Sequence, residues 1–289
     1  MTDFTDMERA QVLTQAIPYI KQYSTKTVVI KYGGNAMVNE ELKQQVMEDI
    51  VLLDAIGVRV VLVHGGGPEI NDMLGRLGIK SEFVNGLRVT DRETVEIAQM
   101  VLAGKVNKDL VKLIQSRGGK AVGLSGIDGK LLAAKFKDKE LGYVGEIIEV
   151  NKGIVEDVIE KGYIPVISTI ASDREGHTYN INGDTAAGAI AGALKAERLI
   201  MLTDTQGVLH DKDDPDTIIP RLSISECEQL KEEGVICGGM IPKVDCCTAA
   251  VRAGVRSVVI MDGRVPHSIL MELFSDAGAG TMIVEDQDV

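Results

Sequence analysis

The chain has 289 residues, enough for two average domains or one large α/β domain, and 45% of them are hydrophobic against 26% charged. This composition is typical of a globular protein with its own core and excludes a disordered chain. Acidic residues outnumber basic ones 43 to 31, and the net charge of −12 argues against binding nucleic acid or an anionic membrane by general charge.

Apolar residues recur at helical spacing through the first 23 residues, and Pro18 interrupts them. Because proline removes a backbone donor and clashes with the preceding turn, we expect a kinked amphipathic helix over 1–24, ahead of a main domain at 25–289. Such a helix can pack on its own domain or on another subunit.

Nothing in the sequence favours export or membrane insertion. The N-terminus is acidic without an apolar segment before a cleavage site, and no apolar run approaches the ~18 residues of a membrane-spanning helix. The four cysteines form no CxxC pair and have no histidines at metal-ligand spacing. We therefore expect reduced, structural thiols in a cytoplasmic protein.

From residue 27 onward, short β-rich runs alternate with helical ones. We expect strands at 27–32, 58–63, 121–124, 131–135, 143–150, 164–168, 198–202, 257–261 and 281–284. We expect helices at 39–56, from 68, and at 91–103, 106–117, 154–161, 183–194, 224–233, 240–253 and 267–274. Repeated βα units predict a three-layer αβα sandwich around a mainly parallel sheet, with a hairpin over 131–150 and lobes at 25–200 and 201–289.

Two expected strands end in glycine turns, Lys-Tyr-Gly-Gly-Asn at 31–35 and His-Gly-Gly-Gly-Pro at 64–68. Each turn follows the carboxyl end of a strand and leads into a helix, which is where open α/β sheets bind ligands. Glycines let successive backbone N–H groups turn toward an anion, with a helix N-terminus behind them. Neither turn is a P-loop or a GxGxxG fingerprint, so the pair predicts an anion site of another architecture.

Other segments carry polar side chains at the ends of strands or the starts of helices. They are Asn-Ile-Asn-Gly-Asp at 180–184, Leu-Thr-Asp-Thr-Gln-Gly-Val at 202–208 and Gly-Gly-Met-Ile-Pro-Lys at 238–243. Structural interpretations remain open for them: Asp184 can be a helix cap and Lys243 a solvated cation. Arg88 can form a surface ion pair or bind a carboxylate bidentately.

Taken in order, the two glycine turns, Asn-Gly-Leu-Arg-Val-Thr at 85–90, the 180–184 segment and the 238–243 segment resemble the amino acid kinase family over 25–289. Within it they resemble the kinases of N-acetyl-L-glutamate, the second step of arginine biosynthesis. The resemblance implies that ATP phosphorylates the γ-carboxylate, giving an acyl phosphate and ADP. An ionised carboxylate needs no general base, so the chemical demand is to bring two anions together and spread the phosphoryl charge, which suits lysines, N–H groups and Mg²⁺.

The resemblance also assigns roles to single residues. It implies that Lys31 and Lys243 stabilise the transferring phosphoryl group and that Asp184 orients both lysines. The implied acetylglutamate-binding residues are Gly66, Gly67, Asn180 and, on the α-carboxylate, Arg88. The implied ATP-binding residues are Gly33, Gly34, Thr203, Asp204, Gly207, Val208, Gly239 and Met240. Mg²⁺ would be held mainly by the nucleotide phosphates, without a protein ligand.

Family members that arginine inhibits resemble this chain at both ends. They carry a kinked N-terminal helix that interlaces dimers into a hexamer, a trimer of dimers, and a C-terminal segment like 267–274 together with 278–281. The resemblance therefore implies a homohexamer with feedback inhibition by arginine. The implied arginine-site residues are Tyr19, His267, Glu272, Gly278 and Gly280. Some relatives also bind a trimeric nitrogen-signalling regulator, which this sequence leaves open.

Three alternatives stay open at this point. The nearest is a kinase of the same fold acting on aminoadipate, aspartate, glutamate or carbamate. A nicotinamide-dependent oxidoreductase would explain the strand–glycine–helix units, but it lacks GxGxxG. A non-catalytic sensor on this fold would leave Lys31, Asp184 and Lys243 without a role.

Overall fold

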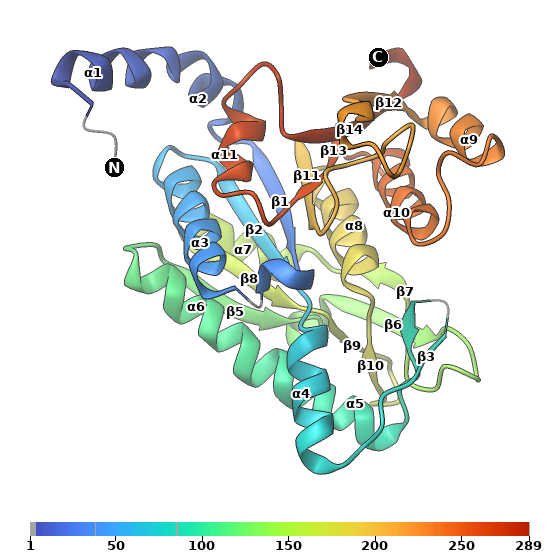
Figure 1. Cartoon of the computed structure of the whole chain (residues 1–289). Coiled ribbons are helices and arrows are strands. Elements are labelled where there is room, and N and C mark those ends of the chain that lie inside the picture. Colours follow the sequence, from blue (N-terminus) through green and yellow to red (C-terminus); the bar gives the residue numbers. More distant parts are fainter. Residues whose placement is uncertain (1–3, 38, 85, 289) are drawn as a thin grey trace.

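The three-layer αβα sandwich predicted from the βα alternation is confirmed by a computed structural model, which describes residues 4–37, 39–84 and 86–288 (Figure 1). Eight strands form the central sheet in the order β12-β14-β13-β11-β1-β2-β8-β5. Neighbouring strands are parallel except β13 and β14. The sheet strands are β1 (Thr27–Tyr32), β2 (Arg59–His64), β5 (Ala121–Ser125), β8 (Ile164–Ser168), β11 (Arg198–Thr203), β12 (Arg221–Ser223), β13 (Val258–Asp262) and β14 (Gly280–Val284).

Helices cover both faces of this sheet. The helices of the described residues are α1 (Asp6–Gln15), which lies away from the sheet, α2 (Ile17–Tyr23), α3 (Glu40–Ala55), α4 (Gly67–Leu77), α5 (Arg92–Gln99), α6 (Asn107–Ser116), α7 (Gly153–Glu160), α8 (Gly183–Leu194), α9 (Ile224–Glu232), α10 (Met240–Arg252) and α11 (Ser268–Leu273). One buried core lies between the sheet and α7 to α10, and the other lies between the sheet and α2 to α6 with α11. A smaller sheet holds β6 (Leu132–Phe136), β7 (Gly145–Val150), β9 (Ile170–Ser172) and β10 (Thr178–Asn180), and a hairpin holds β3 (Phe83–Val84) and β4 (Leu87–Arg88).

Alternation along the two central strands decides which way their last residues point. On β1, Val29 belongs to the core under α8, whereas Val28 and Ile30 belong to the opposite core. The period of two along a strand therefore turns Lys31 toward α8. On β2 the same alternation turns His64 toward the core of α6.

Helix α8 is built almost entirely of small residues, which lets α10 approach it closely. A Cβ added at Gly192 would lie 2.7 Å from the Cβ of Ala253, and one at Gly188 would lie 3.5 Å from the carbonyl oxygen of Cys246. Asn182 caps α8 by accepting from the N–H groups of Asp184 and Thr185, both at 3.0 Å. The first turns of α8 and α10 are thereby brought side by side.

The N-terminal helical stretch is divided close to Pro18: α1 ends at Gln15, and α2 begins at Ile17 with Pro18 in its first turn. Thr5 and Glu8 form a capping box at the start of α1. None of the α1 residues is buried, and Met7 and Leu13 are 74% and 66% exposed. Figure 1 shows α1 projecting from the body of the molecule.

The prediction of two separate helices over 91–117 is wrong at their junction. A π-helical segment at Met100–Val106 joins α5 to α6 without a break. A π-helix inserts one residue into the turn, so the apolar spacing changes where a sequence pattern suggests an end. The short strands β3, β4, β9, β10 and β12 were not predicted, since two or three residues are too few to display alternation.

Two further features bear on the sequence predictions. Within the described residues, no helix combines the length and apolar character that crossing a membrane requires. All four cysteines carry free thiols, of which Cys227 and Cys247 are buried.

Candidate active site

Two lysines from distant parts of the chain meet at one aspartate. The ammonium group of Lys31, at the end of β1, lies 3.0 Å from Oδ1 of Asp184. The ammonium group of Lys243, in the first turn of α10, lies 3.0 Å from Oδ2 of the same carboxylate. The side chains are only 12%, 16% and 20% exposed for Lys31, Asp184 and Lys243, so water screens them weakly.

The charges of this cluster favour an anion. Burial alone would raise the pKa of Asp184, but the two ammonium groups outweigh burial and lower it. The carboxylate is therefore ionised, and two positive charges against one negative leave a net positive charge. An anionic group placed beside the lysines would balance it.

The first glycine turn closes over this cluster. A Cβ at Gly33 would lie 3.0 Å from Nζ of Lys31, so the backbone passes directly over the ammonium group. Gly34 has a φ of +71°, and a Cβ there would lie 3.1 Å from Oδ1 of Asp204 at the end of β11. Only glycine suits both the left-handed backbone and this close approach.

The second glycine turn lines a cavity of about 150 Å³ that contains all four residues predicted to bind acetylglutamate, namely Gly66, Gly67, Arg88 and Asn180. The Arg88 guanidinium is 4.7 Å from the ring centre of Phe83. It donates to Oδ1 of Asn71 at 2.7 Å, to Oγ of Ser81, and to the carbonyl of Gly67 at 3.3 Å. These contacts hold a planar donor at the cavity wall, an arrangement suited to a carboxylate.

A larger cavity of about 920 Å³ lies between the first turns of α8 and α10. Three of the predicted site residues line it, namely Asp184, Lys243 and Gly239. Asn182 and Leu87 line both cavities, so two ligands would meet near the lysine pair. Lys137 also lines the larger cavity, although its charged loop gave no functional signal in the sequence.

The other predicted ATP-binding residues do not line this cavity. The Thr203 hydroxyl donates within its own loop, to the carbonyl of Thr205 at 3.0 Å. A Cβ at Gly207 would lie 2.4 Å from Oγ1 of Thr281, which also accepts from the Val208 N–H at 2.8 Å. The side chain of Val208 belongs to the hydrophobic core, and Met240 packs against the same core. Nucleotide binding by these residues and by Asp204 stays a prediction.

Four of the five predicted arginine-site residues line a third cavity, of about 320 Å³, near α2 and α11. These four are Tyr19, Glu272, Gly278 and Gly280. Glu272 is ion-paired with Arg198 and accepts from the N–H of Ala279 at 2.8 Å. His267 is not among the lining residues; its Nδ1 lies 2.6 Å from the buried carboxylate of Asp49 on α3.

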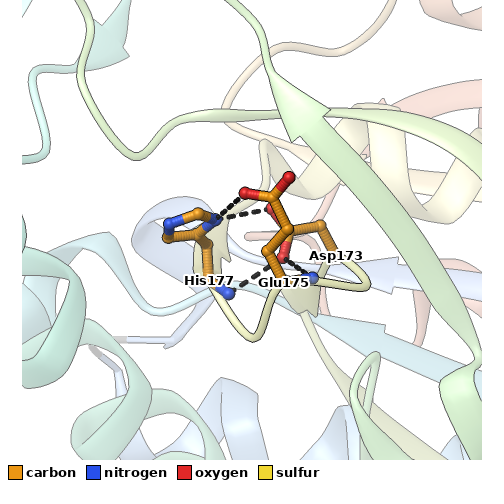
Figure 2. Close-up of side chains that lie close together, drawn as sticks. All are labelled: Asp173, Glu175 and His177. Atoms are coloured by element: carbon orange, nitrogen blue, oxygen red, sulfur yellow. Dashed lines mark hydrogen bonds and ion pairs between the residues drawn. The ribbon is translucent and has the colours of Figure 1, made fainter.

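A group of potential metal ligands lies in the turn between β9 and β10, outside these three cavities. It consists of Asp173, Glu175 and His177, whose side chains lie close together in Figure 2. One potential ligand atom from each residue lies within 4.8 Å of those of the other two. Asp173 already accepts from the N–H groups of Glu175 and His177 at 2.9 Å, from Nδ1 of His177 at 2.8 Å and from the Tyr179 hydroxyl at 2.7 Å. Four donors satisfy this carboxylate, so the group serves the hairpin turn.

Comparison with known proteins gives consistent results. A model of the amino acid kinase family matches residues 26–262. The chain is 55% identical to the acetylglutamate kinase of Synechococcus elongatus over 278 residues, covering 96% of this chain and 92% of the relative. It is 56% identical to the acetylglutamate kinase of Clostridium beijerinckii, covering 96% and 98%.

Two solved structures share the fold. An N-acetylglutamate synthase from Neisseria gonorrhoeae, complexed with coenzyme A and N-acetyl-glutamate, superposes with a TM-score of 0.83 at 26% identity. The match covers 96% of this chain and 63% of the synthase, so this chain spans under two thirds of that protein. Carbamate kinase from Giardia lamblia, bound to AMP-PNP, superposes with a TM-score of 0.66 at 19% identity over 91% of this chain and all of the other.

Proposed function

This chain belongs to the amino acid kinase family. From that premise we propose that it phosphorylates N-acetyl-L-glutamate with ATP in arginine biosynthesis, and that its paired lysines stabilise the phosphoryl group during transfer. The smaller cavity binds the amino acid, with Arg88 on its α-carboxylate and Asn180 beside it. The larger cavity receives the ATP phosphates at the start of α10. One observation supports this function most strongly. Lys31 and Lys243 both contact Asp184, close to residues that line both cavities.

The reaction is an in-line displacement. An oxygen of the γ-carboxylate attacks the γ-phosphorus, a new P–O bond forms, and the bond to the β-phosphate oxygen breaks, so ADP leaves with the electron pair. No proton has to move, because the nucleophile is already ionised. Lys31 and Lys243 neutralise the oxygens of the transferring group, while Asp184 keeps the two ammonium groups from separating.

The residues present fit a magnesium ion carried by the nucleotide. Both oxygens of Asp184 are within 3.0 Å of a lysine ammonium group, so this carboxylate is committed to the lysines. A Mg²⁺ ion would therefore be held mainly by the ATP phosphates, and when bound it supplies further neutralisation of their charge.

The substrate assignment is tested by ADP release with acetylglutamate, glutamate, aspartate, aminoadipate and carbamate as acceptors, with ATP alone as the background. We expect release above background with acetylglutamate and little with glutamate, whose free ammonium group would lie beside the positively charged guanidinium of Arg88. A preference for any of the other acids would refute the assignment.

We further propose that arginine inhibits the enzyme by binding the third cavity. Asp276 lines it, is exposed, and accepts from the Tyr19 hydroxyl at 2.8 Å, so carboxylates of the cavity can receive a guanidinium group. Tyr19→Phe removes that hydroxyl but keeps the ring beside Phe274, 6.4 Å between ring centres. We expect the inhibitory arginine concentration to rise in this variant and not in Tyr163→Phe, which is exposed elsewhere. Equal sensitivity of both variants would refute the site.

The exposed apolar side chains of α1 support a homohexamer in which this helix packs on another subunit. Met7, Val12 and Leu13 are 74%, 54% and 66% exposed. Deleting 1–23 should reduce the hexamer to dimers in light scattering and weaken arginine inhibition. A deleted chain that stays hexameric and equally sensitive would refute both. The cytoplasmic location stays a prediction.

A further inference from the structure

His64, the residue that opens the second glycine turn, is fully buried and has no role in the mechanism above. Its Nδ1 lies 2.8 Å from the carbonyl oxygen of Gly65. Its Nε2 lies 3.1 Å from Nδ2 of Asn107, the first residue of α6. The imidazole ring thus links the glycine turn to a helix 43 positions further along the chain.

The partners of the ring fix which nitrogen carries the proton. A carbonyl oxygen only accepts, so Nδ1 of His64 must donate to Gly65. Nδ2 of Asn107 also lies 3.1 and 2.8 Å from the carbonyl oxygens of Leu124 and Val166, so its two N–H bonds are shared among three acceptors, while its Oδ1 accepts from Lys108 at 3.0 Å. The amide nitrogen therefore faces Nε2, which must accept. Burial lowers the pKa of His64 to about 4, in keeping with this neutral tautomer.

Holding the Gly65 carbonyl also sets the direction of the next N–H group. In a planar trans peptide the C=O of one residue and the N–H of the next point in opposite directions, and no described peptide bond is cis. The Gly65 N–H is itself held by the Tyr32 carbonyl at 3.1 Å, at the end of β1. His64 therefore directs the N–H of Gly66, a residue that lines the acetylglutamate cavity.

The π-helical segment supplies the rest of this support. A Cβ at Gly66 would lie 2.6 Å from Cδ2 of Leu102 and 3.3 Å from Cγ2 of Val106, both within Met100–Val106. Asn107 also packs closely on strand β5. A Cβ at Gly123 of this strand would lie 1.9 Å from Oδ1 of Asn107, so this position has room only for glycine. The inserted residue thus places two apolar side chains against the turn and Asn107 under the imidazole.

We propose that His64 is a positioning residue: as a neutral Nδ1–H donor, oriented by Asn107, it aims the Gly66 N–H at the γ-carboxylate of the bound acetylglutamate. This inference rests on the proposed placement of acetylglutamate in the smaller cavity. Asn107 and the π-helical segment are the parts that keep the donor in place.

Two substitutions of His64 each keep one of its two hydrogen bonds, either the bond to the Gly65 carbonyl or the bond from Asn107. In His64→Asn the amide nitrogen occupies about the place of Nδ1 and still donates to Gly65. In His64→Gln the amide oxygen reaches about the place of Nε2 and accepts from Asn107, but the donor to Gly65 is lost. Both remove the buried ring, so both lose stability, and the contrast between them isolates the Gly65 bond.

We expect kcat/KM for acetylglutamate to be about tenfold or more lower in His64→Gln than in His64→Asn, with KM for ATP within about twofold between them. Equal kcat/KM in the two variants would overturn the proposal. Wild-type protein that does not phosphorylate acetylglutamate would instead overturn the proposed function.

A measurement on the wild-type chain covers the case in which neither variant folds. Nitrogen-15 spectra of histidine-labelled protein contain signals from four histidines, and His64→Asn or Asn107→Leu identifies that of His64. We expect a neutral ring with the proton on Nδ1 at pH 7, whereas most free neutral histidines carry it on Nε2. A His64 signal with the proton on Nε2, or a charged ring, would overturn the proposal.

Discussion

The two glycine turns lie side by side at the ends of β1 and β2, yet they are held by opposite kinds of chemistry. The turn after β1 closes over an ionised cluster, in which Lys31 and Lys243 share the carboxylate of Asp184. The turn after β2 is held by neutral hydrogen bonds, from His64 to the Gly65 carbonyl and from Asn107 to His64. The register pairs Tyr32 with His64, so the strands end at the same level.

This difference follows from what each turn must do. Lysines that neutralise a moving phosphoryl group need long side chains and a partner they can release. A turn that offers a backbone N–H needs a fixed peptide plane, and a buried charge beside it would add a large desolvation cost. The first turn should therefore respond to substitution in kcat, and the second in stability and substrate affinity.

The largest effect is expected from the lysines. Lys31→Ala and Lys243→Ala should each lower kcat by on the order of 10²–10³, because each removes charge needed most in the transition state. The double variant should be less impaired than the product of the single effects, since the residues act as one unit. Steady-state ADP release measures this. Lys112→Ala, which removes an exposed ion pair with Asp109, is the control. Unchanged turnover in Lys31→Ala would defeat the assignment.

The sequence allowed one turn to be interpreted further than the other, for physical reasons. Lys31, Asp184 and Lys243 stand in motifs at strand ends and helix starts, and these positions converge in any parallel α/β sheet. The role of His64 depends on Asn107, whose position follows from the π-helical segment. The apolar periodicity there predicts two separate helices, so no pattern brought the two side chains together. The sequence likewise did not indicate that Lys137 lines the larger cavity, because a lysine in a charged loop is usually exposed to solvent.

The second largest effect is on acid stability. Burial lowers the pKa of His64 from 6.5 to about 4, so between these values the unfolded chain binds more protons than the folded one. The neutral ring therefore makes its full contribution to the free energy of unfolding above pH 6.5. This contribution falls by up to about 3 kcal/mol as the pH decreases toward 4. Urea unfolding of wild type and His64→Asn at pH 7.5, 6 and 5 measures the difference between them, which should shrink toward low pH.

Asp49 acts in the opposite direction over this range. Burial raises its pKa from 3.8 to about 6, so its contribution to stability falls as the pH rises through that interval. It does so equally in wild type and His64→Asn and cancels in the difference. A difference that stays constant from pH 7.5 to 5 would mean that His64 titrates alike in the folded and unfolded chain.

A smaller effect is expected from Gly66→Ala in the second turn. The new Cβ would lie 2.6 Å from Cδ2 of Leu102, so backbone or core must move, at a cost of about 1–3 kcal/mol. The displaced turn should also raise KM for acetylglutamate. A double-mutant cycle with Leu102→Ala tests the cause, because the truncated side chain makes room for the methyl group. Strictly additive losses of stability would show that this contact is not responsible.

The smallest effect is expected from Gly33→Ala, the matching change in the first turn. Its Cβ would lie 3.0 Å from Nζ of Lys31, the far end of a flexible side chain that can shift at little cost. Stability should therefore change by less than about 0.5 kcal/mol. The shifted ammonium group should lower kcat by about three- to tenfold, with KM for acetylglutamate nearly unchanged. Thermal unfolding and steady-state kinetics on Gly33→Ala and Gly66→Ala together show whether the charged turn alters turnover and the neutral turn alters stability and affinity. The reverse pattern would mean that the division between the two turns is wrong.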